Sequence, residues 1–356
     1  MGADPSSPDR AFGAAPVSAE AESRTVSVII AAYNAEATLA RAIRSALAQP
    51  EAAEVIVVDD ASPDTTLEIA RDEAARDARV KPLSLARNSG PGAARNLGLD
   101  SATSDFVAVL DADDVFLPGR LARLLACQDA EMIADNILFA TQGALGSLPD
   151  ISDEEPRFET IDAAAFVRGN LPRRGIARGE LGFLKPLMSR DFLERYGLRY
   201  DPDLRLGEDF DLYLRMLRAG AKLRMTRVPG YAALVRAESL SAQHGTTELS
   251  HFHDCLAGHV AERSGDPSLD RAMRTHLATV RGNRDHRAFL DTRREDGNLA
   301  ALRYAMAAPM RPFSIGWRIL RDKLGLSVRA GDAVPDGAAR LLLPMERDLS
   351  APGGKL

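Results

Sequence analysis

The stretch D-F-V-A-V-L-D-A-D-D, residues 105–114, joins an apolar run to three carboxylates within four residues. The apolar run is too short for a stable helix and is rich in strand-forming side chains, so it predicts a buried β-strand. Asp111, Asp113 and Asp114 would repel one another, and such closely spaced oxygen ligands suit Mg²⁺ or Mn²⁺. The alternative is a solvated acidic turn that opens a helix over residues 117–126.

Length and composition predict a soluble globular protein of one large or two modest domains. The chain has 356 residues, of which 45% are hydrophobic and 27% are charged, as in ordinary globular proteins. The net charge of −6 argues against a general nucleic-acid-binding protein, which needs a basic face. Cys127 and Cys255 form no C-x-x-C pair, so nothing indicates an oxidising compartment. We therefore expect a cytoplasmic protein that binds no nucleic acid.

The two ends of the chain differ in composition from its centre. Residues 1–24 and, apart from the patch Leu341 to Leu343, residues 331–356 are rich in Ala, Pro, Ser and acidic side chains, which predicts a disordered leader and a flexible tail. Residues 1–22 lack the hydrophobic centre of a signal peptide, and no apolar run approaches the ~18 residues that span a bilayer. Between the ends we expect an α/β domain over residues 25–250 and a helical extension over residues 251–330.

Four strands alternate with helices in the first third of the chain. Residues 25–31 form the first strand, whose near-continuous apolar character fits a parallel sheet covered on both faces. Residues 54–58 are the second strand, and residues 79–85 are the third, which Pro82 places near an edge. Residues 106–110 are the fourth. This alternation predicts a doubly wound, mostly parallel sheet, in which ligands bind beyond the carboxyl ends of the strands.

Polar residues follow every one of these strands. They are Tyr33 and Asn34, Asp59 and Asp60, Arg87 and Asn88, and the aspartates of residues 111–114. Their common location predicts one ligand site. Each also has a structural alternative, because Asn34 could cap a helix over residues 36–48, Asp60 could form a turn, and Asn88 could cap the helix that Pro91 opens.

Four motifs at these strand ends carry a family resemblance. They are S-V-I-I-A-A-Y-N at 27–34, V-I-V-V-D-D-A-S at 55–62, R-N-S-G-P-G-A-A-R-N at 87–96 and V-L-D-A-D-D at 109–114. Together they resemble the non-processive family 2 glycosyltransferases, although that family usually has Pro in place of Ala31 and often Gly in place of Ala61. The resemblance implies the GT-A fold, with a Rossmann-like nucleotide-binding half, and a UDP-sugar as donor.

The resemblance also implies roles for individual residues. In its terms Ala32, Tyr33 and Asn34 lie at the base pocket, Asp60 pairs with the uracil or ribose, Arg87 and Asn88 support the nucleotide, and Asp111, Ala112 and Asp113 hold the metal and diphosphate. The implied metal is Mg²⁺ or Mn²⁺, with Asp111 and Asp113 as ligands.

The second half of the chain contains another informative element, G-E-D-F-D-L-Y-L-R-M-L at 207–217. Its apolar residues fall on one face of a helix that Glu208 and Asp209 open and that Gly220 ends. Compensation of the helix dipole is the structural alternative for these two acids. In the resembling family a G-E-D motif carries the catalytic base, and Asp209 matches it, with Glu208 beside it.

Two further segments resemble the family more loosely. One contains Tyr231, Arg236, Ser239, Ser241 and His244. In the family this segment helps to close the donor site, and we include His244 among the candidate metal ligands. The other is G-F-L-K-P-L-M-S-R at 182–190. Both look like the branch that builds succinoglycan-type bacterial exopolysaccharide repeats.

Three remaining features each have two interpretations. The five basic residues of 168–185 form either a mobile loop over a diphosphate or a solvated loop. His251, Cys255 and His259 would align on one face of a helix, where they form either a zinc site or an ordinary helix surface. No fourth zinc ligand accompanies them. Residues 302–326 mix aromatic and aliphatic residues with basic ones, which suits an anionic membrane surface or packing on the catalytic domain.

The sequence thus predicts an inverting, metal-dependent glycosyltransferase. It would move a sugar, glucose in our prediction, from a UDP-sugar to a lipid-linked oligosaccharide in bacterial exopolysaccharide or other surface polysaccharide synthesis, with peripheral attachment to the cytoplasmic face of the inner membrane. A sugar nucleotidyltransferase would instead show a Gly-rich basic loop where this chain has A-A-Y-N. A glycoside hydrolase would need no nucleotide pocket, and a non-catalytic nucleotide-sugar-binding protein would not need Asp209.

Overall fold

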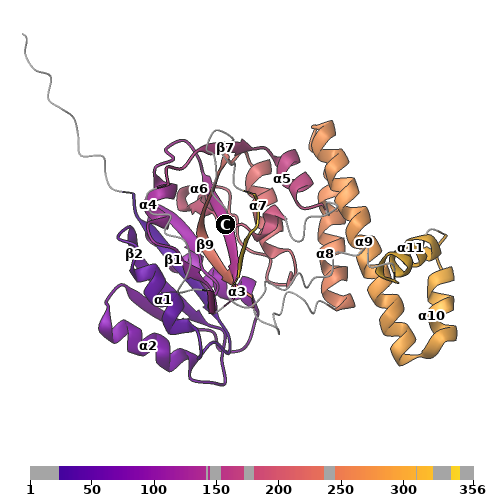
Figure 1. The fold of residues 1–356 in the computed structure, drawn as a ribbon, viewed down its shortest axis with the longest axis horizontal. Coiled ribbons are helices and arrows are strands. Elements are labelled where there is room, and N and C mark those ends of the chain that lie inside the picture. Colours follow the sequence, from indigo (N-terminus) through magenta and orange to yellow (C-terminus); the bar gives the residue numbers. More distant parts are fainter. Residues whose placement is uncertain are drawn as a thin grey trace, which may run out of the picture.

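The chain folds into an α/β body from which a set of helices extends. The computed structural model describes residues 24–141, 143–144, 154–171, 180–235, 245–309, 311–323 and 338–344. In Figure 1 the strands and helices β1 to β9 form the body, and α8 to α11 extend from it. We call these four helices, residues 246–323, the helical arm.

The first half of the body is a parallel sheet. Its elements are β1 (Val26–Ala32), α1 (Leu39–Leu47), β2 (Ala52–Asp59), α2 (Thr66–Arg76), β3 (Val80–Ser84), α3 (Pro91–Ser101) and β4 (Phe106–Val109). Strands β2 and β4 pair with the two sides of β1, and β3 pairs with β2, all in parallel. β3, which contains Pro82, lies at the edge of the sheet. These findings confirm the predicted doubly wound arrangement.

The second half of the body adds strands of both directions. They are β5 (Val115–Phe116), β6 (Met132–Ala140), β7 (Phe158–Ile161), β8 (Leu187–Ser189), β9 (Leu223–Leu234) and β10 (Ala339–Leu341). The sheet runs β3-β2-β1-β4-β8-β6-β9-β5, and β7 and β10 pair with β9 and β6. Because β8 lies antiparallel between β4 and β6, the sheet changes from parallel to mixed beside the D-A-D-D turn.

The other helices cover the sheet or form the helical arm. They are α4 (Arg120–Leu125), α5 (Ala163–Gly169), the 3₁₀ helix η2 (Leu181–Phe183), α6 (Arg190–Arg195), α7 (Glu208–Arg218), α8 (Thr246–Ala261), α9 (Pro267–Glu295), α10 (Gly297–Met306) and α11 (Arg311–Lys323). The arm therefore begins at Thr246, somewhat earlier than the predicted residue 251. Among the described helices none is both long and apolar enough to cross a membrane.

Two predicted helix caps and one predicted helix start differ from the structure. Helix α1 begins at Leu39 after Thr38, and Asn34 adopts a left-handed conformation with φ 51° in the preceding turn, so it does not cap α1. Pro91 opens α3 as predicted, but the preceding residue is Gly90, so Asn88 is not its cap. The D-A-D-D turn leads into β5 rather than directly into a helix, and the helix-dipole explanation for its acids is therefore wrong.

Part of the predicted flexible tail belongs to the sheet. Strand β10 pairs antiparallel with β6, and the Asn136 side chain donates to the Leu343 carbonyl at 2.8 Å and accepts from its amide at 3.0 Å. The prediction of flexibility is wrong for residues 338–344, because backbone pairing and this Asn136 bridge fix them. Residues 1–23 of the predicted leader, and the other tail positions, lie outside the described residues.

His276 joins the helical arm to α7. Its buried ring, on α9, lies 4.9 Å from the Phe210 ring of α7 and 5.7 Å from the Phe252 ring of α8. Neither ring nitrogen has a hydrogen-bond partner within the described part of the chain. Burial favours the neutral imidazole and lowers its pKa from 6.5 to about 4.

Replacing His276 by Phe should remove a loss of stability in acid. A lowered folded-state pKa means that the neutral ring stabilises the fold fully above pH 6.5, and that this stability is lost as the pH falls toward 4. Between neutral pH and about pH 5 the wild type should lose about 2 kcal/mol more than His276→Phe, measured by urea unfolding. The exposed His251→Phe is the control, and equal losses in all three proteins would contradict the assignment.

Candidate active site

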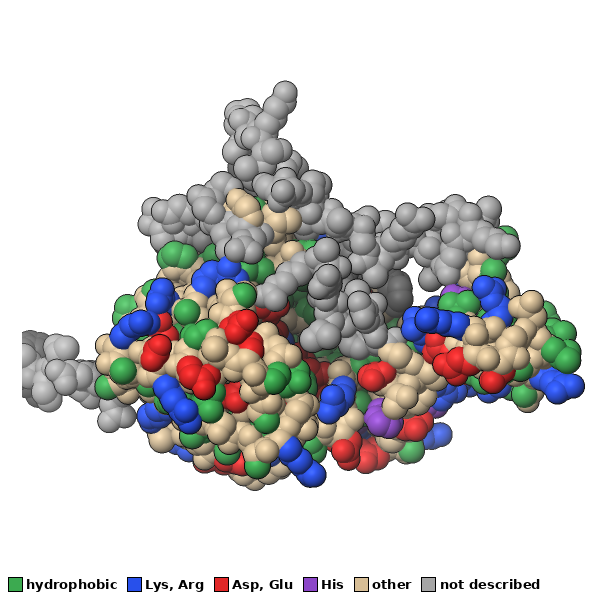
Figure 2. Space-filling view, turned by 90° about the horizontal axis from the view of Figure 1, so that it is seen from below, with side chains coloured by type: hydrophobic (Ala, Val, Ile, Leu, Met, Phe, Trp, Pro, Cys, Tyr) green, Lys and Arg blue, Asp and Glu red, His purple; other side chains and the backbone are tan. Residues whose placement is uncertain are grey.

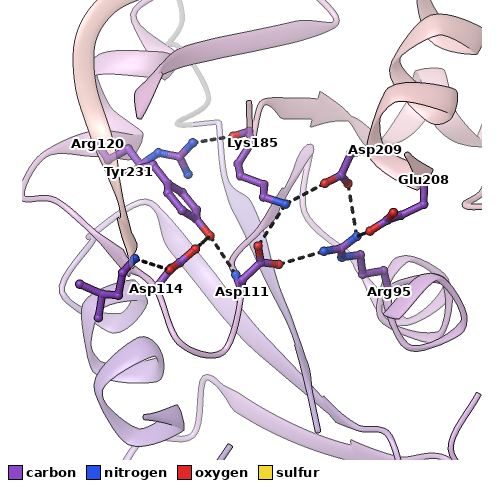
Figure 3. Close-up of polar contacts among 9 residues, drawn as sticks. Arg95, Asp111, Asp114, Arg120, Lys185, Glu208, Asp209 and Tyr231 are labelled. Atoms are coloured by element: carbon purple, nitrogen blue, oxygen red, sulfur yellow. Dashed lines mark hydrogen bonds and ion pairs between the residues drawn. The ribbon is translucent and has the colours of Figure 1, made fainter. Parts of the chain in front are cut away.

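A network of buried charges lies at the carboxyl end of β4 (Figure 3). Arg95 donates from Nη2 to Asp111 Oδ1 at 2.9 Å. From Nη1 it donates to Glu208 Oε1 at 3.0 Å and to Asp209 Oδ1 at 3.3 Å. Lys185 Nζ lies 2.7 Å from Asp209 Oδ2 and 3.1 Å from Asp111 Oδ2. Two cations therefore connect the first acid of the D-x-D motif with both acids of the G-E-D motif.

Four separate segments supply these side chains. Arg95 lies in α3, Asp111 follows β4, Lys185 lies between η2 and β8, and the G-E-D acids open α7. Gly207 makes the last placement possible, since its φ of 78° is left-handed and a Cβ there would lie 2.4 Å from the Phe252 ring. A side chain at this position would force α8 away from the start of α7.

The charges in the network stabilise one another. Burial alone would raise the pKa of Asp111, but Lys185 and Arg95 outweigh it and hold that pKa well below its ordinary value. Burial likewise opposes the charge on both cations, yet Asp111 and Asp209 raise the pKa of Lys185 and of Arg95. These three groups therefore stay ionised at neutral pH.

Asp114 has a different environment from its neighbours in the D-A-D-D turn. It is buried, and its carboxyl accepts from the Tyr231 hydroxyl at 2.7 Å and from the Leu234 amide at 2.8 Å. Burial, reinforced by the charges of Asp111 and Asp113, raises its pKa well above the ordinary value. Asp114 thus anchors the turn to β9, and the three carboxylates do not form one uniform cluster.

The donor set of this turn fits a hard divalent cation. Asp111 and Asp113 are both partly exposed and are separated only by the buried Ala112. Carboxylate oxygens are the ligands that Mg²⁺ and Mn²⁺ prefer. A cation held here would share Asp111 with Lys185, because Lys185 already contacts one of its oxygens. The third predicted ligand, His244, lies outside the described residues, as do Arg236, Ser239 and Ser241.

The predicted nucleotide-binding residues surround the same sheet edge. Ala32 is buried at the end of β1, whereas Tyr33 is 48% exposed and Arg87 and Asn88 are exposed. The exposed Tyr33 ring is available for stacking with a base. Asp60 is instead turned inward.

Asp60 holds the turn before α3 in place. Its two oxygens accept from the Ser89 amide at 2.7 Å and from the Gly90 amide at 2.8 Å. These bonds join the ends of β2 and α3. The turn-forming alternative for Asp60 therefore has direct structural support, while a carboxylate oxygen with two lone pairs keeps capacity for a further donor.

The zinc interpretation of the α8 stripe does not fit the structure. Cys255 and His259 do approach a carboxylate, that of Asp211, with His259 Nε2 at 2.7 Å and Cys255 Sγ at 3.3 Å from Oδ1. However, Arg218 lies 3.2 Å from His259 Nδ1, where a metal-binding histidine normally donates to an acceptor. These residues instead tie α7 to α8, and Arg215 completes the set by binding Asp211.

Two members of the charge network were missed by the sequence analysis. Arg95 lies within one of the family motifs, but the sequence analysis assigned no role to its side chain. Lys185 was considered only as one of the basic residues of a loop. A basic residue between apolar neighbours on a short amphipathic helix is a weak signal for Arg95. For Lys185 the sequence offers no signal, since its partners are 74 and 24 positions away.

Comparison with known sequences places the chain in a class of proteins, the glycosyltransferases. Residues 27–154 match the model described as glycosyl transferase family 2. The chain is 42% identical over 311 residues to succinoglycan biosynthesis protein ExoU of Rhizobium meliloti (strain 1021), covering 87% of this chain and 91% of that protein. The chain belongs to glycosyltransferase family 2, which confirms the resemblance seen in the sequence motifs.

Other comparisons agree with this membership. The chain is 26% identical over 226 residues to the Escherichia coli protein WfaP, named as a UDP-Glc:α-D-GlcNAc-diphosphoundecaprenol β-1,3-glucosyltransferase, covering 61% and 80% of the two chains. Among solved structures, Staphylococcus aureus TarS 1–349 with UDP-GlcNAc has a TM-score of 0.54 at 18% identity, covering 89% and 96%. The mannosyltransferase PcManGT of Pyrobaculum calidifontis, solved with GDP-Man and Mn²⁺, has a TM-score of 0.53 at 18% identity, covering 86% and 81%. These structures confirm the predicted GT-A fold.

Replacing Arg95 by Met should destabilise the protein more than any exposed Arg substitution. The change leaves the buried Asp209 and the partly buried Asp111 and Glu208 with Lys185 as the remaining cation of the network. Removing one partner from a buried ionic group costs about 3 kcal/mol or more, which urea unfolding at neutral pH measures. The matched control is Arg87→Met, at an exposed position, where a change within about 0.5 kcal/mol is expected. Similar values for the two variants would disprove the anchoring role.

Proposed function

We propose that the enzyme is an inverting, metal-dependent glycosyltransferase of bacterial exopolysaccharide or other surface polysaccharide synthesis. Its donor is a UDP-sugar, with glucose as the sugar, and its acceptor is a hydroxyl of a lipid-linked oligosaccharide at the cytoplasmic face of the membrane. The observation that carries this proposal is the contact of Lys185 with both Asp111 and Asp209. It brings the candidate diphosphate site and the candidate base together.

The relatives' names support the donor and acceptor classes. ExoU is named for succinoglycan biosynthesis, and WfaP is named for glucose transfer from UDP-Glc to a sugar on diphosphoundecaprenol. The exposed Tyr33 and the cations Arg87, Arg95 and Lys185 around one sheet edge suit a nucleotide diphosphate. A sugar nucleotidyltransferase is a poorer explanation, because the turn that follows β1 contains no basic residue through Asn34.

In the proposed reaction the acceptor hydroxyl oxygen attacks the anomeric carbon of the donor sugar. The bond between that carbon and the diphosphate oxygen breaks, and its electron pair leaves with UDP. The hydroxyl proton goes to Asp209, which acts as the general base. A single displacement of this kind inverts the configuration at the anomeric carbon and needs one base.

The contacts of Asp209 indicate which oxygen acts as the base. Oδ2 is held by Lys185 at 2.7 Å, whereas within the described residues Oδ1 has only the longer 3.3 Å contact with Arg95. Oδ1 is therefore the oxygen that an acceptor hydroxyl can approach at lower cost. Glu208, which contacts Arg95 at 3.0 Å, holds that guanidinium as Oδ1 exchanges partners.

A divalent cation bound by Asp111 and Asp113 would neutralise charge on the leaving diphosphate. Lys185 and Arg95 supply fixed positive charge beside the same carboxylates. Such preorganised charge stabilises a developing anion without reorganisation at the moment of reaction.

Replacing Asp209 by Asn should separate chemistry from binding. We expect kcat to fall by at least ~10² because the base is lost, while the Kd for UDP stays near the wild-type value. Steady-state transfer assays and calorimetry measure the two quantities. Glu208→Gln should cost less than Asp209→Asn, and Asp203→Asn, at an exposed position, serves as the surface control. A parallel loss of UDP affinity in Asp209→Asn would make Asp209 a binding residue instead.

Replacing Asp113 by Asn should abolish the Mn²⁺-dependent part of UDP binding and leave the thermal unfolding midpoint nearly unchanged. The reason is that a cation at this turn depends on the Asp111 and Asp113 carboxylates. Calorimetric titration of UDP with and without Mn²⁺ measures the effect. Asp114→Asn in the same turn should retain Mn²⁺-dependent binding, because the Asp114 carboxyl bonds Tyr231 and Leu234. Unchanged Mn²⁺ dependence in Asp113→Asn would refute the metal site.

A further inference from the structure

The exposed apolar side chains of this protein are concentrated at the end of the helical arm. Nine large hydrophobic residues are exposed in the described part of the chain, and six of them belong to α10 and α11. They are Leu299, Leu302 and Met306 on α10, and Phe313, Trp317 and Leu320 on α11. Figure 2 shows apolar side chains along the outer end of the arm, with basic side chains beside them. We call these six residues the hairpin face.

Each of the two helices presents its large apolar residues outward. On α10 the exposed residues Leu299, Leu302 and Met306 are spaced by three and four positions, which places them on one side, while Ala301 and Ala305 are buried. On α11 Ile315 is buried, and the exposed aromatic residues Phe313 and Trp317 are spaced by four positions. Soluble helices normally turn such large residues inward. A concentrated apolar surface of this kind marks an interaction site.

Polar contacts fix the orientation of this face. Arg318 donates to the Thr279 carbonyl of α9 at 3.1 Å, and Arg311 donates to the Tyr304 carbonyl of α10 at 3.0 Å. Asp285 of α9 lies 3.7 Å from Arg311. α10 and α11 are thus held on α9, and the hairpin face stays outward. The described part of the predicted membrane segment, residues 302–309 and 311–323, lies mainly in two helices, and the exposed apolar surface begins earlier, at Leu299.

The charge of α10 and α11 indicates which kind of partner would bind the hairpin face. Residues 297–323 contain five basic residues and one acidic residue, a net charge of +4, in a chain whose net charge is −6. Arg303 lies exposed among the apolar residues of α10. Two copies of so basic a segment would repel each other, which disfavours self-association through it. An anionic surface that also accepts apolar side chains is complementary to both properties.

We propose that the hairpin face docks on an anionic phospholipid bilayer, with α10 and α11 lying in the headgroup region. The two helices have 10 and 13 residues, too few to span a bilayer, so docking is peripheral and reversible. The site rests on exposure and charge, independently of the catalytic residues. It adds to the proposed function a surface that would bring the enzyme to a lipid-linked acceptor.

Trp317 offers a direct test because it is the single tryptophan of the chain and belongs to the hairpin face. Full-length protein is titrated with phosphatidylglycerol vesicles and, separately, with phosphatidylcholine vesicles. We expect a blue shift of the Trp317 emission with the anionic vesicles, reversed by high salt. An equal response to neutral vesicles, or no response to either, would overturn the proposal. A shift that appears with protein concentration and without lipid would assign the face to self-association instead.

The double substitution Leu302→Ser and Phe313→Ser tests the surface by vesicle flotation. Both side chains are exposed, so the fold should persist, which circular dichroism and thermal unfolding check. Recovery with anionic vesicles should fall at least tenfold. Tyr196→Ser, at an exposed aromatic residue outside the arm, should float like the wild type. Sugar transfer to a water-soluble acceptor analogue should be equal in all three proteins, which separates docking from catalysis. Undiminished flotation of the double variant would refute the hairpin face.

Discussion

The rest of the site depends on the contacts that the buried guanidinium of Arg95 makes with three carboxylates. One planar group binds acids from the D-x-D turn and from the first turn of α7, which are 16, 113 and 114 positions away in sequence. Its donors form a rigid fork that can serve several carboxylates from one buried position, which a lysine ammonium does less well. The ends of α3, β4 and α7 therefore cannot shift independently. Lys185 adds a second, shorter link across the same gap.

The D-A-D-D turn shows how one short motif can hold carboxylates for different purposes. Asp111 faces two cations, which keep its pKa low, whereas Asp114 faces Tyr231 and a backbone amide, where burial raises its pKa. The neutral tendency of Asp114 limits the repulsion that three adjacent anions would create. It also binds the turn to β9 through Leu234. Asp114 thus holds the turn in place while Asp111 keeps its negative charge.

Much of the fold followed from the sequence, because alternating apolar runs and polar strand ends are local patterns. β1 to β4, the edge position of β3 and the acids that open α7 were all predicted. The predicted helix caps were wrong. Asn34 and Asn88 were chosen because Asn is a common N-cap residue, but the geometry of the preceding turns makes Thr38 and Gly90 the N-cap residues of α1 and α3. Side-chain contacts between residues far apart in the sequence, such as those of Arg95 and Lys185, could not be predicted from these local patterns.

The helical arm has a structural part as well as an outward surface. Phe252 closes over Gly207, and His276 packs on Phe210, so α8 and α9 support the helix that carries the G-E-D acids. The His259, Cys255 and Asp211 contacts strengthen the same junction. None of these partners could be read from the sequence pattern of α7, whose buried face looks like that of any amphipathic helix.

Strand β10 has a practical consequence for work with shortened chains. Because β10 pairs with the end of β6 and Asn136 bonds to Leu343, the chain returns to the body of the protein after leaving the arm. A protein cut after residue 330 would keep the whole arm yet uncover backbone groups of β6 that are paired in the intact chain. Loss of solubility in such a fragment would then report an open sheet edge rather than any property of the arm, and point substitutions are the cleaner tool.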